Sequence, residues 1–267
     1  MYKGSTIGIG TDAKTPKGEK LENPVMTGVQ YLAPAKTSGV ANLCSFSTNG
    51  CEEVCIFNTG RGMMTTTQQH RLNRTVQFVQ NKAEYMLKLE KDIEALIRKA
   101  DKKNMIPSVR LNGTSDLPWE RMPFVGKNGW RYASILQRFP QVKWYDYTKN
   151  PHRAKQQPYH LTYSRAETAD SHKYSLELLA SGVNVAVVFG ITNKKQSNDE
   201  MLPLPKTWNG YKVIDGDVSD VRFYDEQGVV VGLRFKTSRG QALDGSTDAT
   251  GFVVAVDWID GEPIARV

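Results

Sequence analysis

The stretch VNVAVVFG, residues 183–190, is apolar at nearly every position, which is typical of a strand buried on both faces of a sheet. It follows SHKYSLELLAS, residues 171–181, whose apolar residues recur at helical spacing, and Gly182 is suited to the left-handed position that ends a helix. YHLTYS, residues 159–164, predicts another strand before that helix. A strand, a helix and a second strand in this order predict two parallel strands joined by a right-handed crossover.

The same alternation extends over most of the chain. Further strands are predicted at residues 28–35, 107–113, 142–148 and 211–217, with a long amphipathic helix at 66–102 and a shorter one at 130–139. About six strand–helix units fit between residues 28 and 217. We therefore predict an α/β fold, a partial (β/α)6-type barrel with parallel strands.

The two ends of the chain have a different pattern. Residues 1–27 are polar and predict a loosely ordered lead-in. Near the C-terminus, residues 228–236 and 251–258 predict two strands that pair as an antiparallel hairpin. The predicted organisation is an N-terminal lead-in (1–27), an α/β domain (28–217) and an antiparallel β C-terminal extension (218–267).

Composition describes an ordinary soluble globular protein. Of the 267 residues, 24% are charged and 39% are hydrophobic, and no apolar run approaches the roughly 20 residues that span a bilayer. The N-terminus lacks the apolar core of a secretory signal, so we expect a cytoplasmic protein with no membrane partner. The formal net charge of +7 is compatible with an anionic partner such as nucleic acid, and equally with a basic solvated surface.

All three cysteines, Cys44, Cys51 and Cys55, fall within the twelve residues CSFSTNGCEEVC. An odd number of cysteines in a reducing compartment argues against a disulfide framework. Their loop follows the first predicted strand, and loops at the carboxyl ends of parallel strands converge on the site of an α/β protein. Three interpretations are open: small buried residues, a zinc site with His70 as a fourth ligand, or an iron–sulfur cluster held by three thiolates.

The polar surroundings of the cysteines disfavour a role as inert core residues. We expect an iron–sulfur cluster of the 4Fe-4S type, in which three cysteines leave one iron open for a substrate or cofactor, with zinc as the alternative metal.

Four motifs follow one another along the chain. They are NLCSFSTNGCEEVCIFNTGRG (42–62), VRLNGTSDLPWE (109–120), YDYTKNP (145–151) and DVSDVRF (217–223). In this order they resemble the phage protein family known as the gene product eighty-eight domain. The resemblance spans most of residues 28–257 and implies a bacteriophage source, with the host cell cytoplasm as the location.

The cysteine triplet after the first strand of a repeating β/α domain also resembles the radical S-adenosylmethionine (SAM) architecture. The match is in number and position, because the spacing here is six and then three residues, whereas that superfamily typically has three and then two. The resemblance implies a radical-SAM-like fold, SAM as a cofactor, and cofactor contacts from Asn112, Ser115 and Asp116. For Asp116 the alternative is a helix cap in front of Pro118.

Lys149, at the end of the strand predicted at 142–148, is a further candidate for cofactor binding. Its ammonium suits a carboxylate or a phosphate, and the alternative is a solvated lysine before a helix. The chain is thus expected to be an iron–sulfur protein with a radical-SAM-like site and an unknown small-molecule or macromolecular substrate. The alternative is a non-catalytic protein, stabilised by zinc or an iron–sulfur cluster, that binds nucleic acid or a host protein.

Overall fold

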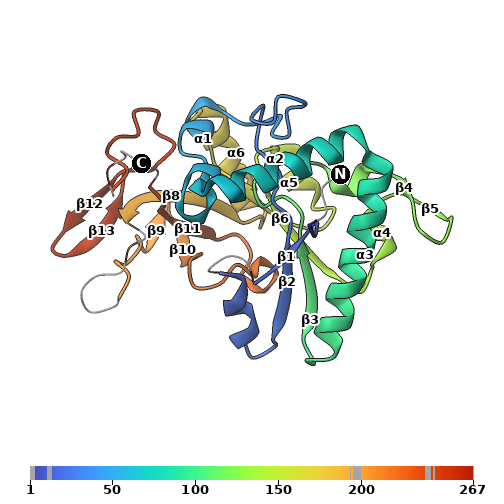
Figure 1. The fold of residues 1–267 in the computed structure, drawn as a ribbon. Coiled ribbons are helices and arrows are strands. Elements are labelled where there is room, and N and C mark those ends of the chain that lie inside the picture. Colours follow the sequence, from blue (N-terminus) through green and yellow to red (C-terminus); the bar gives the residue numbers. More distant parts are fainter. Residues whose placement is uncertain are drawn as a thin grey trace.

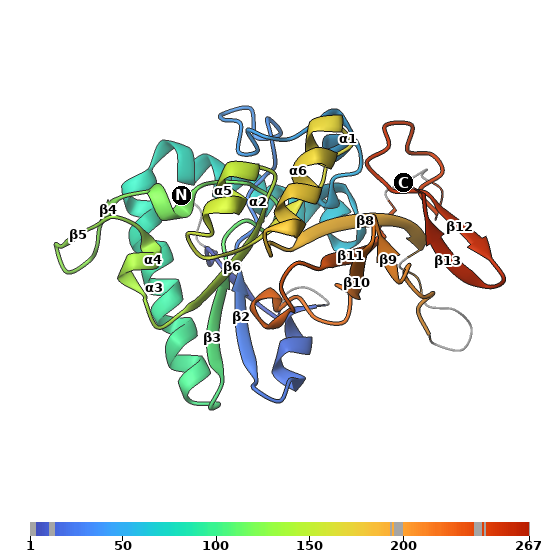
Figure 2. The same ribbon diagram turned by 180° about the vertical axis from the view of Figure 1, so that it is seen from behind.

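A computed structural model of the chain describes residues 4–10, 14–192, 194, 200–237, 242 and 244–266. The strands of its main sheet are β1 (Gly8–Ile9), β2 (Val25–Val29), β3 (Ile106–Arg110), β6 (Lys143–Thr148), β7 (His160–Ser164), β8 (Val185–Thr192), β9 (Thr207–Trp208), β10 (Tyr211–Asp215) and β11 (Val230–Phe235). Within the described residues these nine strands pair in the order β1-β2-β3-β6-β7-β8-β11-β10-β9 (Figures 1 and 2). The strands from β2 to β10 in this order are mutually parallel, and the antiparallel β1 and β9 form the two edges.

Six α-helices and five short 3₁₀ helices are described, and five of the α-helices pack against the sheet. The α-helices are α1 (Asn49–Glu53), α2 (Thr65–Gln80), α3 (Lys82–Asp101), α4 (Ile135–Arg138), α5 (Pro151–Gln156) and α6 (Ala169–Ala180), and the 3₁₀ helices are η1 (Thr15–Lys20), η2 (Ile56–Asn58), η3 (Gly60–Met63), η4 (Trp119–Arg121) and η5 (Arg222–Tyr224). Side chains of α2, α3 and α4 pack with those of β2 and β3, and side chains of α5 and α6 pack with those of β7 and β8. The predicted mixed α/β class with a largely parallel sheet is therefore confirmed.

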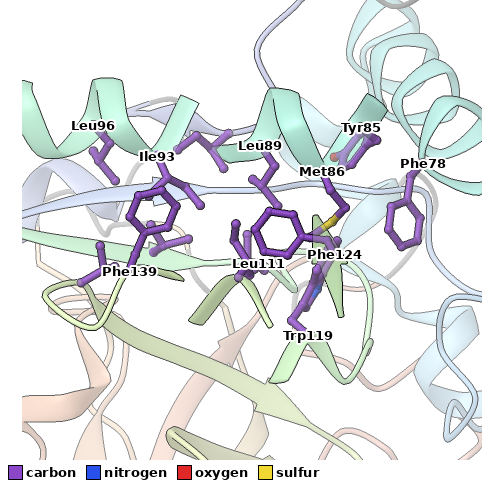
Figure 3. Close-up of a cluster of buried hydrophobic side chains, with 14 of the residues drawn as sticks. Phe78, Tyr85, Met86, Leu89, Ile93, Leu96, Leu111, Trp119, Phe124 and Phe139 are labelled. Atoms are coloured by element: carbon purple, nitrogen blue, oxygen red, sulfur yellow. The ribbon is translucent and has the colours of Figure 1, made fainter. Parts of the chain in front are cut away.

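The larger apolar core lies between α3 and the sheet (Figure 3). Leu89, Ile93 and Leu96 recur at three- and four-residue steps and are fully buried against residues such as Val109 and Leu111. Burying each of these side chains contributes about 1.5–3 kcal/mol. This packing fixes β3, and with it the loop that follows β3, against the helical layer.

The helix predicted at residues 66–102 is two helices. Asn81 separates α2 from α3 and has non-helical backbone angles, φ −132° and ψ 54°. The Asn81 side chain favours such a break because it competes with the helix for backbone hydrogen bonds. The break leaves α2 free to contact the segment after β2, where Arg74 donates to the Tyr31 carbonyl oxygen at 2.8 Å. The periodicity of apolar residues does not reveal the break, because α3 alone accounts for most of the buried stripe.

Two other predicted elements have different bounds. The first parallel strand runs from Val25 to Val29, earlier than the predicted 28–35, because its register with β3 begins at the Val25–Ile106 pair. The helix predicted at 130–139 is only α4, preceded by β5 (Arg131–Tyr132), which pairs with β4 (Phe124–Val125). Ser134 caps this helix by accepting from the Gln137 backbone N–H at 3.2 Å, so the helix begins after it.

The predicted pairing of residues 228–236 with 251–258 is wrong. The first of these segments is β11, which lies between β8 and β10 and is parallel to both. Its run of valines suits a strand buried in the middle of a sheet. An antiparallel hairpin does exist near the C-terminus, formed by β12 (Val256–Ile259) and β13 (Glu262–Ala265).

The sheet is open, and a closed barrel is not formed by the described strands. The two sides of the sheet are nevertheless linked by the segment that precedes β2. Lys14 forms an ion pair of 2.6 Å with Asp217, which follows β10, and donates to the Gly216 carbonyl oxygen at 3.0 Å. Because β2 and β10 lie near opposite edges of the sheet, the sheet must curve to bring these residues together.

Candidate functional site

A cavity of about 470 Å³ lies where the parallel strands β2, β3, β6, β7 and β11 end. This volume is in the range of small-molecule sites, which favour the carboxyl ends of such strands. All the residues predicted for the site line this cavity: Cys44, Cys51, Cys55, Asn112, Ser115, Asp116 and Lys149. The fold therefore brings together, at one end of the sheet, the residues that the sequence singled out.

The cysteine loop is held by α1, whose first turn carries Cys51. Thr48 caps this helix by accepting from the Cys51 backbone N–H at 3.3 Å. The Glu167 carboxylate, from the segment between β7 and α6, accepts from the Thr48 hydroxyl at 2.7 Å and from the Gly50 backbone N–H at 2.9 Å. Burial alone would raise the pKa of Glu167, but these two hydrogen bonds lower it below its ordinary value. Both views place α1 beside α6, as this clamp requires (Figures 1 and 2).

The three thiols are free and half-buried. Burial raises the pKa of Cys44 to about 12 and that of Cys55 to about 11, and it also raises the pKa of Cys51. The negative charge of an ionised Cys51 would raise the pKa of both Cys44 and Cys55 further. Three thiolates in this place therefore need a compensating positive charge, and a bound metal supplies one.

Apolar side chains pack against one of the three cysteines, Cys51. Val54, Phe235, Phe252 and Val253 form a buried cluster that packs against Cys51. The segment carrying Phe252 is fastened by Arg165, whose guanidinium donates to the Gly251 and Phe252 carbonyl oxygens at 3.1 and 2.9 Å. The region near the C-terminus thus contributes a wall of the cavity.

A single zinc ion and an iron–sulfur cluster place different demands on the positions of the ligating side chains. Within the described part of the chain, no group of three or more His, Cys, Asp or Glu side chains is arranged to hold a single metal ion. His70, the predicted fourth ligand of a zinc site, is exposed on α2, and the described cavity lining does not include it. A zinc ion needs its sulfur ligands about 2.3 Å from one point. A cluster makes a weaker demand, because each thiolate binds a different iron of the group.

Asn112 organises the loop that follows β3. Its side-chain oxygen accepts from the Ser115 hydroxyl, the Leu117 backbone N–H and the Trp119 indole N–H at 2.9, 2.9 and 3.2 Å. Its side-chain nitrogen donates to the Leu117 carbonyl oxygen and to Asp146 at 3.0 and 3.2 Å. Because both of its donors are used, Asn112 is suited to shaping the loop, whereas the Ser115 oxygen can still accept a hydrogen bond.

Asp116 joins this loop to both neighbouring segments. Its backbone N–H donates to the Leu43 carbonyl oxygen at 2.8 Å, next to Cys44. Its carboxylate accepts from the Thr148 hydroxyl, the Lys149 backbone N–H and Arg153 at 3.1, 2.8 and 3.1 Å. The alternative role of capping a helix after it is not observed, since η4 has no side-chain cap. Burial raises the pKa of Asp116, although the bond from Lys149 and the charge of Arg153 oppose this.

The Lys149 ammonium is held inside the protein. It donates to the Ser164 hydroxyl and carbonyl oxygens, both at 3.2 Å, and to the Arg165 carbonyl oxygen at 3.0 Å. It also lies 4.7 Å from the centre of the Phe252 ring. Burial lowers the pKa of Lys149, while Cys51 and Asp116 raise it, so this cation is electrostatically coupled to the cysteine loop.

A buried ion pair that the sequence did not reveal forms the floor of the cavity. Arg110, at the end of β3, lies 3.1 Å from Asp220, which comes from the segment between β10 and β11. Tyr145 donates to the same carboxylate at 3.0 Å, and the Arg110 guanidinium lies 4.6 Å from the centre of the Tyr147 ring. Burial would raise the pKa of Asp220, but the Arg110 charge lowers it below its ordinary value. The motif DVSDVRF contains Asp220, yet only the fold shows that it meets Arg110.

Comparisons with known proteins identify a family. A sequence profile described as Gene product 88 matches residues 7–255, so the chain belongs to this family of phage gene products, as its motifs indicated. No curated protein and no solved structure matches the chain. Among the described residues, no helix has the length and apolar character needed to cross a membrane.

Proposed function

We propose that this member of the Gene product 88 family is a radical-SAM-like iron–sulfur protein that acts in the host cytoplasm. In this proposal Cys44, Cys51 and Cys55 hold a 4Fe-4S cluster with one open iron. The observation that carries it is that all three thiols line one cavity at the carboxyl ends of parallel strands. When bound, a cluster with an open iron would bind SAM and supply the electron for its reductive cleavage.

The strand order supports a radical-SAM-like partial barrel as the finer description of the fold. The strands β2, β3, β6, β7 and β8 are neighbours in the order in which the chain forms them. This is how a (β/α) barrel is wound. In the proposed partial barrel, η1 and η5 fill the gap that a further strand would close.

In this proposal, the residues around the cysteines favour the thiolate form and keep water away from the cluster. Positive charge favours thiolates. The Lys149 charge acts to lower the pKa of Cys51, and the Arg71 charge acts to lower that of Cys55. Burial has the larger effect, so the pKa of each thiol remains above its ordinary value. The apolar cluster around Phe252 would exclude water from one side of the cavity.

The loop after β3 would bind the cofactor. Ser115 and Asp116 line the cavity and keep acceptor capacity beyond their internal hydrogen bonds, so they suit the amino group of SAM. Asn112 would hold this loop in place. Lys149 would act through its charge, because its three donors are already used.

The test is whether SAM binds to the reconstituted, reduced protein. Electron paramagnetic resonance spectra recorded with and without SAM should differ, and dithionite should produce deoxyadenosine. Asp116→Asn should weaken the spectral change without loss of iron. An unchanged spectrum at saturating SAM, with no deoxyadenosine, would reject the radical-SAM-like function. A protein that keeps its metal under those conditions would instead match the second candidate, a metal-stabilised binding protein for nucleic acid or a host protein.

A further inference from the structure

Lys236 is a cation that the cavity leaves without a partner. It follows β11, is half-buried and lines the cavity. Within the described residues its ammonium makes no hydrogen bond and no ion pair at the distances that define them. A half-buried ammonium without such a partner is unfavourable, because it has lost part of its hydration and has gained nothing in return.

The neighbouring charges are already committed to one another. Asp217 pairs with Lys14 at 2.6 Å, and Asp220 pairs with Arg110 at 3.1 Å. Arg234, two residues before Lys236, pairs with Asp215 at 2.9 Å. The carboxylates close to Lys236 therefore each serve another cation.

The pKa of Lys236 is consistent with this lack of a partner. Burial and the nearby Lys14 lower the pKa of Lys236 to about 8, although Asp217 and Asp220 partly oppose this. Arg110 adds a further positive charge in the same region. An anionic group placed here would meet an uncompensated cation in a partly desolvated site, where a charge-assisted hydrogen bond is strong.

Part of the wall of this cavity is apolar. Val188, Leu233, Phe235 and Phe252 line the same cavity, and Val188, Phe235 and Phe252 also pack together. A ligand that reaches Lys236 with an anionic group can thus lay an apolar body against these side chains.

We propose that the cavity binds a small molecule with an apolar body and one terminal anionic group, a carboxylate or a phosphate, and that Lys236 binds this group. The inference deepens the proposed function by naming its substrate class, and it rests on that function only in treating the cavity as the substrate site. It requires no metal for the anion contact itself.

The test uses benzoate and phenyl phosphate as probes, with benzyl alcohol as the neutral control. Isothermal titration calorimetry on the metal-free and the reconstituted full chain gives their affinities. Lys236→Met keeps the apolar stem and removes the charge, and it should weaken binding of at least one anionic probe tenfold or more. Lys173→Met, at a side chain that is 74% exposed on α6, is the matched control and should bind as the wild type does.

The two anionic probes distinguish the two sources of charge. If Lys236→Met weakens the binding of benzoate only, the anionic group of the ligand is a carboxylate. If it weakens the binding of phenyl phosphate only, the group is a phosphate. Lys236→Arg should retain binding, which separates the role of the charge from any effect on folding. Equal binding of the probes to wild type and Lys236→Met, or no binding of either anionic probe to the wild type, would overturn the inference. Iron and sulfide content report separately on the proposed function, since Lys236→Met should leave both unchanged.

Discussion

Replacing Glu167 by glutamine should loosen the cysteine loop with little change in side-chain size. The carboxylate accepts two hydrogen bonds, from the Thr48 hydroxyl and the Gly50 backbone N–H, at 2.7 and 2.9 Å. The side-chain oxygen of glutamine can still accept one of these hydrogen bonds. The NH₂ group of glutamine would face the other donor and cannot accept a hydrogen bond from it. A hydrogen bond to a charged group contributes about 1.5–3 kcal/mol when buried, and partial exposure of Glu167 reduces this. We therefore expect Glu167→Gln to lower the free energy of unfolding by about 1 kcal/mol and Glu167→Ala by about 2 kcal/mol.

The pH dependence of this effect has a defined sign. The folded protein holds the pKa of Glu167 below its ordinary value of 4.5, so the charged form stabilises the fold. The contribution is present above the ordinary pKa and is lost as the pH falls through the folded value. The difference between wild type and Glu167→Gln should thus be full at pH 7 and should shrink in acid.

Urea unfolding measures the global effect, and hydrogen exchange at the Gly50 amide measures the local one. Gly50 should exchange faster in Glu167→Gln, because its N–H loses an anionic acceptor. Glu177→Gln is the control, since Glu177 is 57% exposed on α6 and its nearest ion-pair distance is 4.0 Å. If Glu167→Gln changes neither quantity more than this control does, the clamp on α1 contributes nothing and the reasoning is refuted.

Three further predictions concern the loop after β3, the cavity floor and His160 at the start of β7. Asn112→Ala removes the acceptor of the Trp119 indole N–H and should lower the free energy of unfolding in urea by about 3 kcal/mol; a loss under 1 kcal/mol would mean that water replaces these bonds. Asp220→Asn removes the nearer of the two carboxylates beside the Arg110 guanidinium, the other being Asp146 at 3.7 Å, and should cost about 3 kcal/mol; a second change, Arg110→Met, should recover part of it, and strictly additive losses would argue against the pair. Burial lowers the pKa of His160 from 6.5 to about 4, so the unfolded chain takes up a proton first as the pH falls. From pH 7 to pH 5 the wild type should lose about 2 kcal/mol more stability than His160→Gln, and equal losses would show that His160 is not buried in its neutral form.

The sequence was most informative where local pattern and burial agree. The apolar run at 183–190 corresponds to β8, which the structure begins at Val185 and places in the middle of the sheet. The loop of cysteines was located correctly at the carboxyl end of the first parallel strand, because loops after parallel strands share one edge of a sheet.

The sequence was least informative where a partner comes from a distant segment. The strand β11 was expected in a C-terminal hairpin, because its own valines do not specify whether its neighbour is β8 or a later strand. Glu167 lies 117 residues after Gly50, and Asp220 lies 110 residues after Arg110, so no local spacing indicates either contact. Lys236 became a candidate only when the fold placed it in the cavity among charges that pair with one another.

The most direct test of the proposed function is the metal and sulfide content of the protein purified without oxygen from iron-replete cells. We expect about four irons and about four labile sulfides per chain. Both should be lost when Cys44, Cys51 and Cys55 are replaced together by serine, with the far-ultraviolet circular dichroism of the fold retained. Stoichiometric zinc without labile sulfide in the wild type, or iron and sulfide that persist in the triple variant, would contradict the proposed function.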